Sequence, residues 1–254
     1  MKSAKWLLGM IHCGLTRDLN SKLRDLNFRS DRTSGKGTAM GTADDKLIAI
    51  DVLLQPDLSM IDKSKSINAR LRENYQSGYA LDATHMPHVT LLQRFVQAKD
   101  LDAVTAAITK VLVAEQPTAM KLRTSSLDYV RFAGLAVAVL VVERTPELVR
   151  LHNKITDAVA PFSVSGGTPA AFVGADAVAG TVDWVETFVP KASGEYYSPH
   201  ITAGIATEAF LKQLKAAPFE PFAFWPDALA VFQIGNFGTA ARKLWEYQGG
   251  SLHT

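Results

Sequence analysis

Pro87-His88-Val89-Thr90 recurs in the second half of the chain as Pro199-His200-Ile201-Thr202, and each copy lies in an apolar run typical of a buried strand. Alternate side chains of a strand lie on one face, so the histidine and the threonine of each copy point the same way. Each copy therefore presents an imidazole and a hydroxyl together. The duplication predicts two structural halves that each contribute one such strand to a shared cleft.

Apolar periodicity around the motifs predicts similar elements in each half. In the first half we expect a buried strand from residue 46, helices over 59–75 and 99–115, the motif strand over 87–96, and strands over 119–131 and 135–143. In the second half we expect a helix from Thr145-Pro146 to Pro161, the motif strand over 196–205, a helix over 207–216, and strands over 222–234 and 239–247. Residues 163–195 are rich in small residues and indicate an excursion, in which 182–189 forms a short strand or helix.

This order predicts an α+β fold built from a duplicated unit. The folded domain is expected over residues 46–247, with interleaved lobes and a pseudo-repeat of about 46–143 and 144–247. Residues 1–45 are polar after a short apolar run and predict a loose N-terminal extension, and residues 248–254 predict a tail.

Composition excludes several classes of protein. The 254 residues carry a net charge of +2, which gives no polybasic surface for nucleic acid or membrane, and no apolar run is long enough to span a bilayer. The lone Cys13 cannot form an internal disulfide, and no Cys/His cluster predicts zinc. We expect no metal, no cofactor, no membrane association and no protein partner, and a monomer.

The N-terminal residues leave the compartment open. Trp6 to Ile11 follow two lysines and resemble a stunted secretory signal, but His12 interrupts the run and no cleavage site follows promptly. A cytoplasmic location is favoured, and a periplasmic or secreted one stays open. Ser34-Gly35-Lys36-Gly37-Thr38 lacks the first glycine of a phosphate loop, so a plain loop is the better interpretation.

Two histidines suit acid–base chemistry at phosphorus. One neutral imidazole can take a proton from an attacking water or hydroxyl, while a protonated one gives a proton to the departing oxygen. Thr90 and Thr202 could donate hydrogen bonds to the phosphoryl oxygens. The scheme needs no metal, and no Gly-x-Ser-x-Gly elbow supports a serine hydrolase.

His88-Val89-Thr90-Leu91 and His200-Ile201-Thr202-Ala203 resemble the two His-x-Thr/Ser motifs of the two-histidine (2H) phosphoesterase superfamily. The chain looks most like the bacterial branch labelled 2′–5′ RNA ligase or cyclic nucleotide phosphodiesterase, over residues 46–247. The resemblance implies a bilobal, pseudo-twofold fold, with antiparallel-rich sheets lining a central cleft and helices on the outside. It also implies opening of 2′,3′-cyclic phosphates on RNA ends or nucleotides, commonly leaving a 2′-phosphate. It implies His88 and His200 as general base and acid, without saying which is which, and Thr90 and Thr202 as phosphate-binding hydroxyls.

The surrounding residues are less informative than the motifs. The side chains that could contact an RNA end or nucleotide are Arg94, Phe95, Tyr196, Tyr197, Arg242 and Lys243. His85 precedes the first motif and predicts a surface or supporting role, whereas His12, His152 and His253 have no partner at a recognisable spacing. Three functions therefore remain: a metal-independent phosphoesterase, a silent module that binds RNA ends or nucleotides, and a histidine-dependent esterase of another kind.

Overall fold

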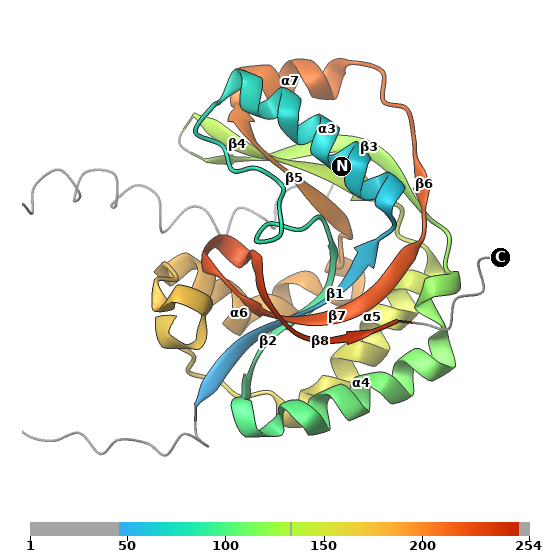
Figure 1. The fold of residues 1–254 in the computed structure, drawn as a ribbon, viewed down its shortest axis with the longest axis vertical. Helices are drawn as coiled ribbons and strands as arrows, with labels where there is room; N and C mark the ends of the chain where they lie inside the picture. Colours follow the sequence, from blue (N-terminus) through green and yellow to red (C-terminus); the bar gives the residue numbers. More distant parts are fainter. Residues whose placement is uncertain (1–45, 133, 249–254) are drawn as a thin grey trace, which may run out of the picture.

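The computed structural model describes residues 46–132 and 134–248, so the expectations for residues 1–45 and for the end of the tail concern parts outside the described residues. Eight strands form one antiparallel sheet in the order β6-β3-β4-β5-β2-β1-β7-β8 (Figure 1). Their bounds are β1 (Leu47–Pro56), β2 (Val89–Gln97), β3 (Leu122–Phe132), β4 (Leu135–Val142), β5 (His200–Thr207), β6 (Ala223–Phe224), β7 (Pro226–Ile234) and β8 (Ala240–Tyr247). The predicted α+β class is confirmed, and the expected sheets are two halves of one continuous, curled sheet.

In the part of the chain that the structure describes, five α-helices accompany the strands: α3 (Leu58–Asn74), α4 (Leu101–Glu115), α5 (Pro146–Val159), α6 (Ala179–Ala192) and α7 (Glu208–Ala216). Local chemistry sets where several of them begin. Asp57, Thr145 and Thr207 each accept a hydrogen bond from the backbone N–H three residues on, as N-cap side chains do. The segment left open as strand or helix around residues 182–189 is helical, within α6.

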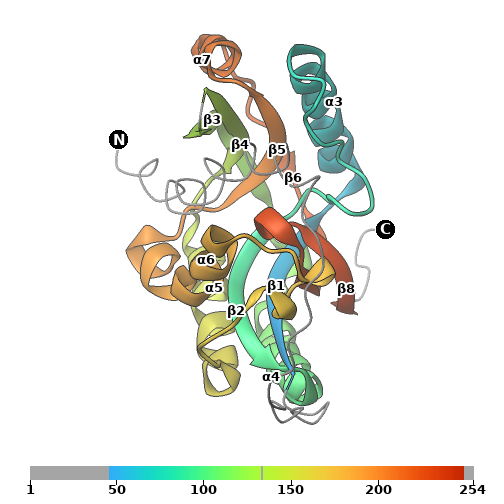
Figure 2. The ribbon, with the colours of Figure 1, turned by 90° about the vertical axis from the view of Figure 1, so that its left-hand side faces the viewer.

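The chain exchanges elements between the two halves of the sheet. Strands β1 and β2 lie in one half with β7 and β8, and β3 to β6 form the other half. Helix α3 joins β1 to β2 in sequence, yet it packs on β5 of the other half (Figure 2). Helices α5 and α6 both precede β5 in sequence, and both pack on β2. Each motif strand is therefore covered by helices that precede the other motif, and neither sequence half encloses its own core.

Close packing explains why a small residue is needed in the 163–195 excursion. A Cβ placed on Gly167 would lie 2.3 Å from the Phe95 ring, so the loop backbone rests directly on that side chain. Phe95 also meets Phe172 edge to face, with ring centroids 5.7 Å apart, and packs near Val185 of α6. The excursion thus covers part of the β1–β2 surface with a small apolar cluster of its own.

Candidate active site

The two motif strands meet at a single register point, where Val89 of β2 pairs with Ile201 of β5 in antiparallel fashion. Antiparallel pairing around that point sets His88 across from Thr202 and Thr90 across from His200. Val89 and Ile201 are fully buried, whereas the four motif side chains are only partly buried. The fold therefore brings the two copies together about an approximate twofold axis, with both histidines and both threonines on one face.

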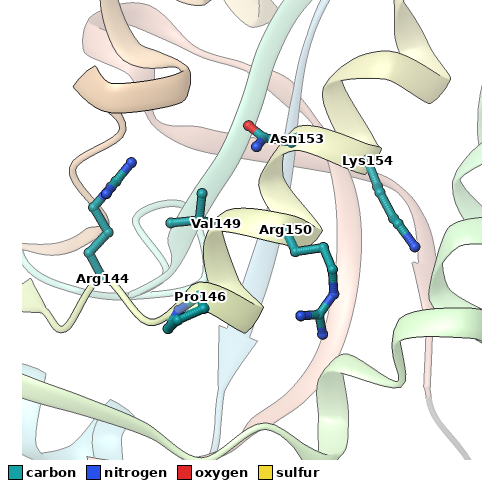
Figure 3. Close-up of a pocket in the computed structure, with 6 residues that line it drawn as sticks. All are labelled: Arg144, Pro146, Val149, Arg150, Asn153 and Lys154. Atoms are coloured by element: carbon teal, nitrogen blue, oxygen red, sulfur yellow. The ribbon is translucent and has the colours of Figure 1, made fainter.

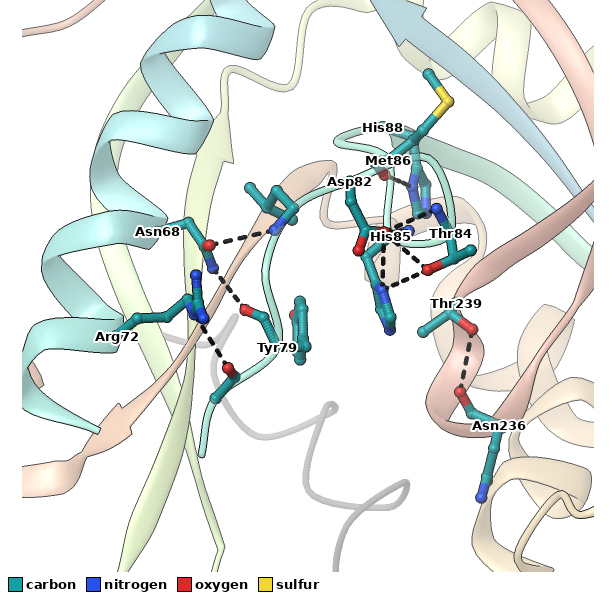
Figure 4. Close-up of polar contacts among 12 residues, drawn as sticks. Asn68, Arg72, Tyr79, Asp82, Thr84, His85, Met86, His88, Asn236 and Thr239 are labelled. Atoms are coloured by element: carbon teal, nitrogen blue, oxygen red, sulfur yellow. Dashed lines mark hydrogen bonds and ion pairs between the residues drawn. The ribbon is translucent and has the colours of Figure 1, made fainter. Parts of the chain in front are cut away.

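Both histidines are held in the same way. The Nδ1 of His88 lies 2.7 Å from the carbonyl oxygen of Met86, and the Nδ1 of His200 lies 2.8 Å from that of Ser198 (Figure 4 shows the first pair). A carbonyl oxygen can only accept a hydrogen bond, so each Nδ1 carries a proton. Each neutral ring then has its lone pair on Nε2, which is the atom available for proton transfer.

The protonation of the two histidines follows from burial. Burial lowers the pKa of both His88 and His200, and the nearby His88 lowers that of His200 further. Both imidazoles are therefore mainly neutral at pH 7. A bound anionic phosphate would favour the protonated form of a neighbouring imidazole, which is the form needed for a general acid.

A buried carboxyl, Asp51, lies beside the first motif and was missed in the sequence. Its Oδ2 accepts hydrogen bonds from the Thr90 hydroxyl at 3.0 Å and from Gln93 Nε2 at 2.7 Å. The same oxygen lies 3.7 Å from Nε2 of His88. Burial raises the pKa of Asp51 to about 7. The available signal was a lone acid in the run Leu47–Leu54, which otherwise predicts a strand buried on both faces.

A β-bulge follows each motif. The register with the neighbouring strand shifts after Thr90, at Leu91, and again after Thr202, at Ala203. A buried polar side chain from a helix bonds the carbonyl of each bulged residue. His152 of α5 reaches the Leu91 oxygen at 2.6 Å, and Asn68 of α3 reaches the Ala203 oxygen at 2.9 Å.

Tyr197 is buried beneath the first motif and contacts protein groups, so it presents no surface to a ligand. It is 4% exposed, its hydroxyl donates to the Thr90 carbonyl at 3.1 Å, and its ring stacks on His152 with centroids 3.9 Å apart. Phe95, at 1% exposed, is equally covered. The sequence-based assignment of these two side chains as substrate contacts is wrong, because burial leaves no surface for a base to stack on.

The remaining peripheral candidates lie at the surface or pair with protein groups. Tyr196 is 41% exposed and belongs to a 3₁₀ turn before β5, so strand alternation does not decide where it points. Arg94 donates to the Glu186 carbonyl at 3.5 Å and Arg242 to Gln233, while Lys243 pairs with Glu246. As contacts to a substrate these side chains stay predictions.

The loop between α3 and β2 carries a further histidine, His85. Its Nδ1 lies 3.2 Å from Asp82 Oδ1, and its ring stacks on Tyr79 with centroids 4.8 Å apart (Figure 4). Asn68 fixes this loop by donating to the Tyr79 carbonyl and accepting from the Leu81 N–H. The loop that delivers His88 is therefore ordered by the same side chain that holds the second bulge.

A separate shallow hollow lies on the solvent side of α5 and contains neither motif (Figure 3). It is lined by Arg144, Pro146, Val149, Arg150, Asn153 and Lys154. Arg150 and Lys154 both pair with Glu115, and Arg144 donates to the Gly194 carbonyl. Within residues 46–132 and 134–248, no three metal-ligating side chains gather, and no helix is long and apolar enough to cross a membrane.

Comparison with known proteins adds a family. Residues 62–236, which include both motifs, match the sequence model described as the 2'-5' RNA ligase superfamily. No curated protein matches the chain. Similar solved structures include TT0787 of Thermus thermophilus, at 17% identity and TM-score 0.49, covering 81% of this chain and 100% of that one. Others are E. coli LigT complexed with 3'-AMP (11%, TM-score 0.42, 81% and 100%) and Kluyveromyces marxianus Usb1 with uridine monophosphate (11%, TM-score 0.37, 80% and 100%).

Proposed function

Because this chain belongs to the 2'-5' RNA ligase superfamily of 2H phosphoesterases, we propose that it opens 2′,3′-cyclic phosphates, or cleaves related 2′–5′ phosphodiesters, on RNA ends or nucleotides. The observation that carries this proposal is the pairing of Val89 with Ile201, which sets two His-x-Thr motifs side by side. One imidazole Nε2 on each side of a phosphate is the arrangement that acid–base cleavage requires.

The proposed reaction with a 2′,3′-cyclic phosphate is a hydrolysis. The neutral imidazole takes a proton from water as the water oxygen bonds to phosphorus. The bond from phosphorus to O3′ breaks, and the protonated imidazole gives its proton to that oxygen. The product is a 2′-phosphate with a free 3′-hydroxyl, and the two histidines exchange protonation states until solvent resets them.

The test uses the full chain, chelator and uridine 2′,3′-cyclic phosphate, with products resolved by phosphorus NMR. We expect turnover to a 2′-phosphate by the wild type, and a loss of at least about 100-fold in kcat for His88→Ala and for His200→Ala. Ser64→Ala is the matched control, because Ser64 is buried on α3 and, among the described residues, bonds only the Met60 carbonyl of its own helix.

The outcome separates the alternatives. Wild-type binding without turnover on cyclic and 2′–5′ substrates would identify a silent module that binds RNA ends or nucleotides. Turnover that survives both histidine substitutions would exclude the proposed machinery. Activity that requires a metal ion would contradict the metal-independent scheme.

A further inference from the structure

The approximate twofold axis duplicates the histidines and the threonines but not the carboxyl. On β1, Leu53 lies opposite Thr90, and two positions earlier Asp51 lies opposite Gln93 of β2. On β4, Val139 lies opposite Thr202, and two positions earlier Val137 lies opposite Ile205 of β5. The first motif therefore has a buried acid next to it, and the second has two aliphatic side chains at the same place.

The bulge explains how one carboxyl reaches both polar neighbours. Thr90 and Gln93 are three residues apart and would lie on opposite faces of a regular strand. The extra residue at Leu91 returns Gln93 to the face of Thr90, so both can donate to Asp51 Oδ2. A hydroxyl has one proton, so in this arrangement Thr90 has none left for phosphate. The Thr202 hydroxyl has no hydrogen-bond partner within the described ranges 46–132 and 134–248.

The surroundings of Asp51 leave His88 as its partner in proton exchange. The carboxyl is fully buried, and its Oδ1 accepts no hydrogen bond from the described part of the chain. The titratable groups that face it are His88, 3.7 Å from Oδ2, and Tyr197, whose hydroxyl already donates to the Thr90 carbonyl. A shift of less than about 1 Å brings the carboxyl oxygen and His88 Nε2 into hydrogen-bond range.

We propose that Asp51 is a positioning residue that shares one proton with His88 and accepts a hydrogen bond from the Thr90 hydroxyl, which makes His88 the general acid. This role rests on the proposed function. Before a substrate binds, the shared proton resides mainly on Asp51; when an anionic phosphate binds, the proton passes to His88 Nε2. His200, which has no such carboxyl, remains neutral and acts as the base.

Burial supports this distribution of protons. It raises the pKa of Asp51 to about 7 and lowers that of His88, so the affinities of the two groups for a proton approach each other. Two groups with similar affinities and a short separation hold a single proton over a wide pH range around neutrality. The pair can thus supply an acid at a pH where an isolated buried histidine would have lost its proton.

The experiment compares two substrates that differ in one atom: uridine 2′,3′-cyclic phosphate and its analogue with sulfur at the bridging 3′ position. A departing thiolate needs no proton, so removing the acid affects only the oxygen substrate. We expect Asp51→Asn and His88→Ala to lose about 100-fold in kcat on the oxygen substrate and less than about 10-fold on the sulfur substrate. His200→Ala should lose equally on both.

Gln233→Leu is the control, because Gln233 is buried in the same half of the sheet but contacts Ala171 and Arg242 rather than the histidines. If Asp51→Asn loses kcat equally on both substrates, Asp51 has only a structural role and the proposal is overturned. The proposal is also overturned if Asp51→Asn turns over both substrates at the wild-type rate.

A titration without turnover separates this proposal from the proposed function. With inorganic phosphate bound, NMR should show that His88 loses its proton at least about 1 pH unit lower in Asp51→Asn than in the wild type. An unchanged titration of His88 overturns the shared proton even if the enzyme is active.

A shifted titration in a protein that does not turn over cyclic phosphate would support the shared proton of Asp51 and His88 but contradict the proposed enzymatic function. If Asp51→Asn does not fold, the wild-type curve decides: a shared proton gives two steps for His88 and an unshared one gives a single step.

Discussion

At the residue scale, His88 and His200 have the same backbone anchor but different electrostatic neighbours. The Nδ1 bond to the carbonyl two residues earlier is repeated in both, and it fixes the tautomer of each ring. Only His88 has a carboxyl within 4 Å of its Nε2 among the described residues. Chemical asymmetry in a duplicated site can therefore arise from one residue, Asp51, on the neighbouring strand.

Asp51 also makes a prediction about stability. Its pKa rises from 3.8 to about 7 on folding, so the folded protein binds this proton more tightly than the unfolded chain. The resulting stabilisation is complete below the unfolded pKa and is lost as the pH rises through about 7. The free energy of unfolding of the wild type, relative to Asp51→Asn, should fall by about 2 kcal/mol between pH 5 and pH 8.

Urea unfolding of both proteins at several pH values measures this difference. His152 and His200 have lowered pKa values and act in the opposite direction, but they are present in both proteins and largely cancel. His88, whose titration is coupled to Asp51 in the proposal, is part of the measured difference. A difference that does not change with pH would show that Asp51 is ionised throughout.

The sequence predicted the four motif residues because their chemistry is local: a proline, a histidine and a threonine in an apolar strand, twice. Asp51 is nearly 40 residues away from Thr90 in sequence, and its contact with Gln93 depends on a bulge that no residue type announces. Tyr197 was misjudged because its aromatic ring is consistent with stacking on a base or on a buried neighbour, and only the position of His152 decides between them.

At the element scale, α3 and α5 each connect one motif to the loop that leads into the other. Asn68 of α3 bonds the bulge after the second motif and the loop before the first. His152 of α5 bonds the bulge after the first motif and stacks on Tyr197, just before the second. Each of these two side chains therefore contacts backbone or side chains next to both motifs.

Asn68→Ala should therefore reduce both stability and activity. It leaves the part-buried Tyr79 carbonyl, the buried Ala203 carbonyl and the Leu81 N–H without their partner, which should cost about 3 kcal/mol in the free energy of unfolding. Thermal unfolding and the cyclic phosphate assay measure the two effects. Glu73→Ala, on the exposed face of the same helix, should change neither by more than about 0.5 kcal/mol.

His152→Phe is the corresponding test on α5. The ring can still stack on Tyr197, but the Leu91 carbonyl loses its hydrogen bond, so we expect a loss of about 1–2 kcal/mol in the free energy of unfolding. Because burial lowers the pKa of His152, the histidine is neutral near pH 7 and the substitution removes no charge. A variant as stable as the wild type would show that the bulge does not depend on this bond.

At the scale of the whole molecule, periodicity predicted most helices and strands and the two halves, since each element is encoded by its own residues. Periodicity could not predict that α3 packs on β5 and α5 on β2, because an apolar helix face does not specify which half of the sheet it covers. Through this packing, the helices that precede each motif cover the strand of the other motif.

Because α3 and α5 each pack on the opposite half of the sheet, the two halves should unfold together. Leu71 of α3 is fully buried and lies against Gly204 of β5, yet α3 is joined directly to β1 of the other half. Leu71→Ala should remove about 2–5 kcal/mol and lower the hydrogen-exchange protection of Leu140 in β4 and of Val52 in β1 by equal amounts. Native-state exchange in increasing denaturant measures both amides. Loss of protection confined to β4 would mean that the halves are independent units, and the Val89–Ile201 junction would then have to align the histidines alone.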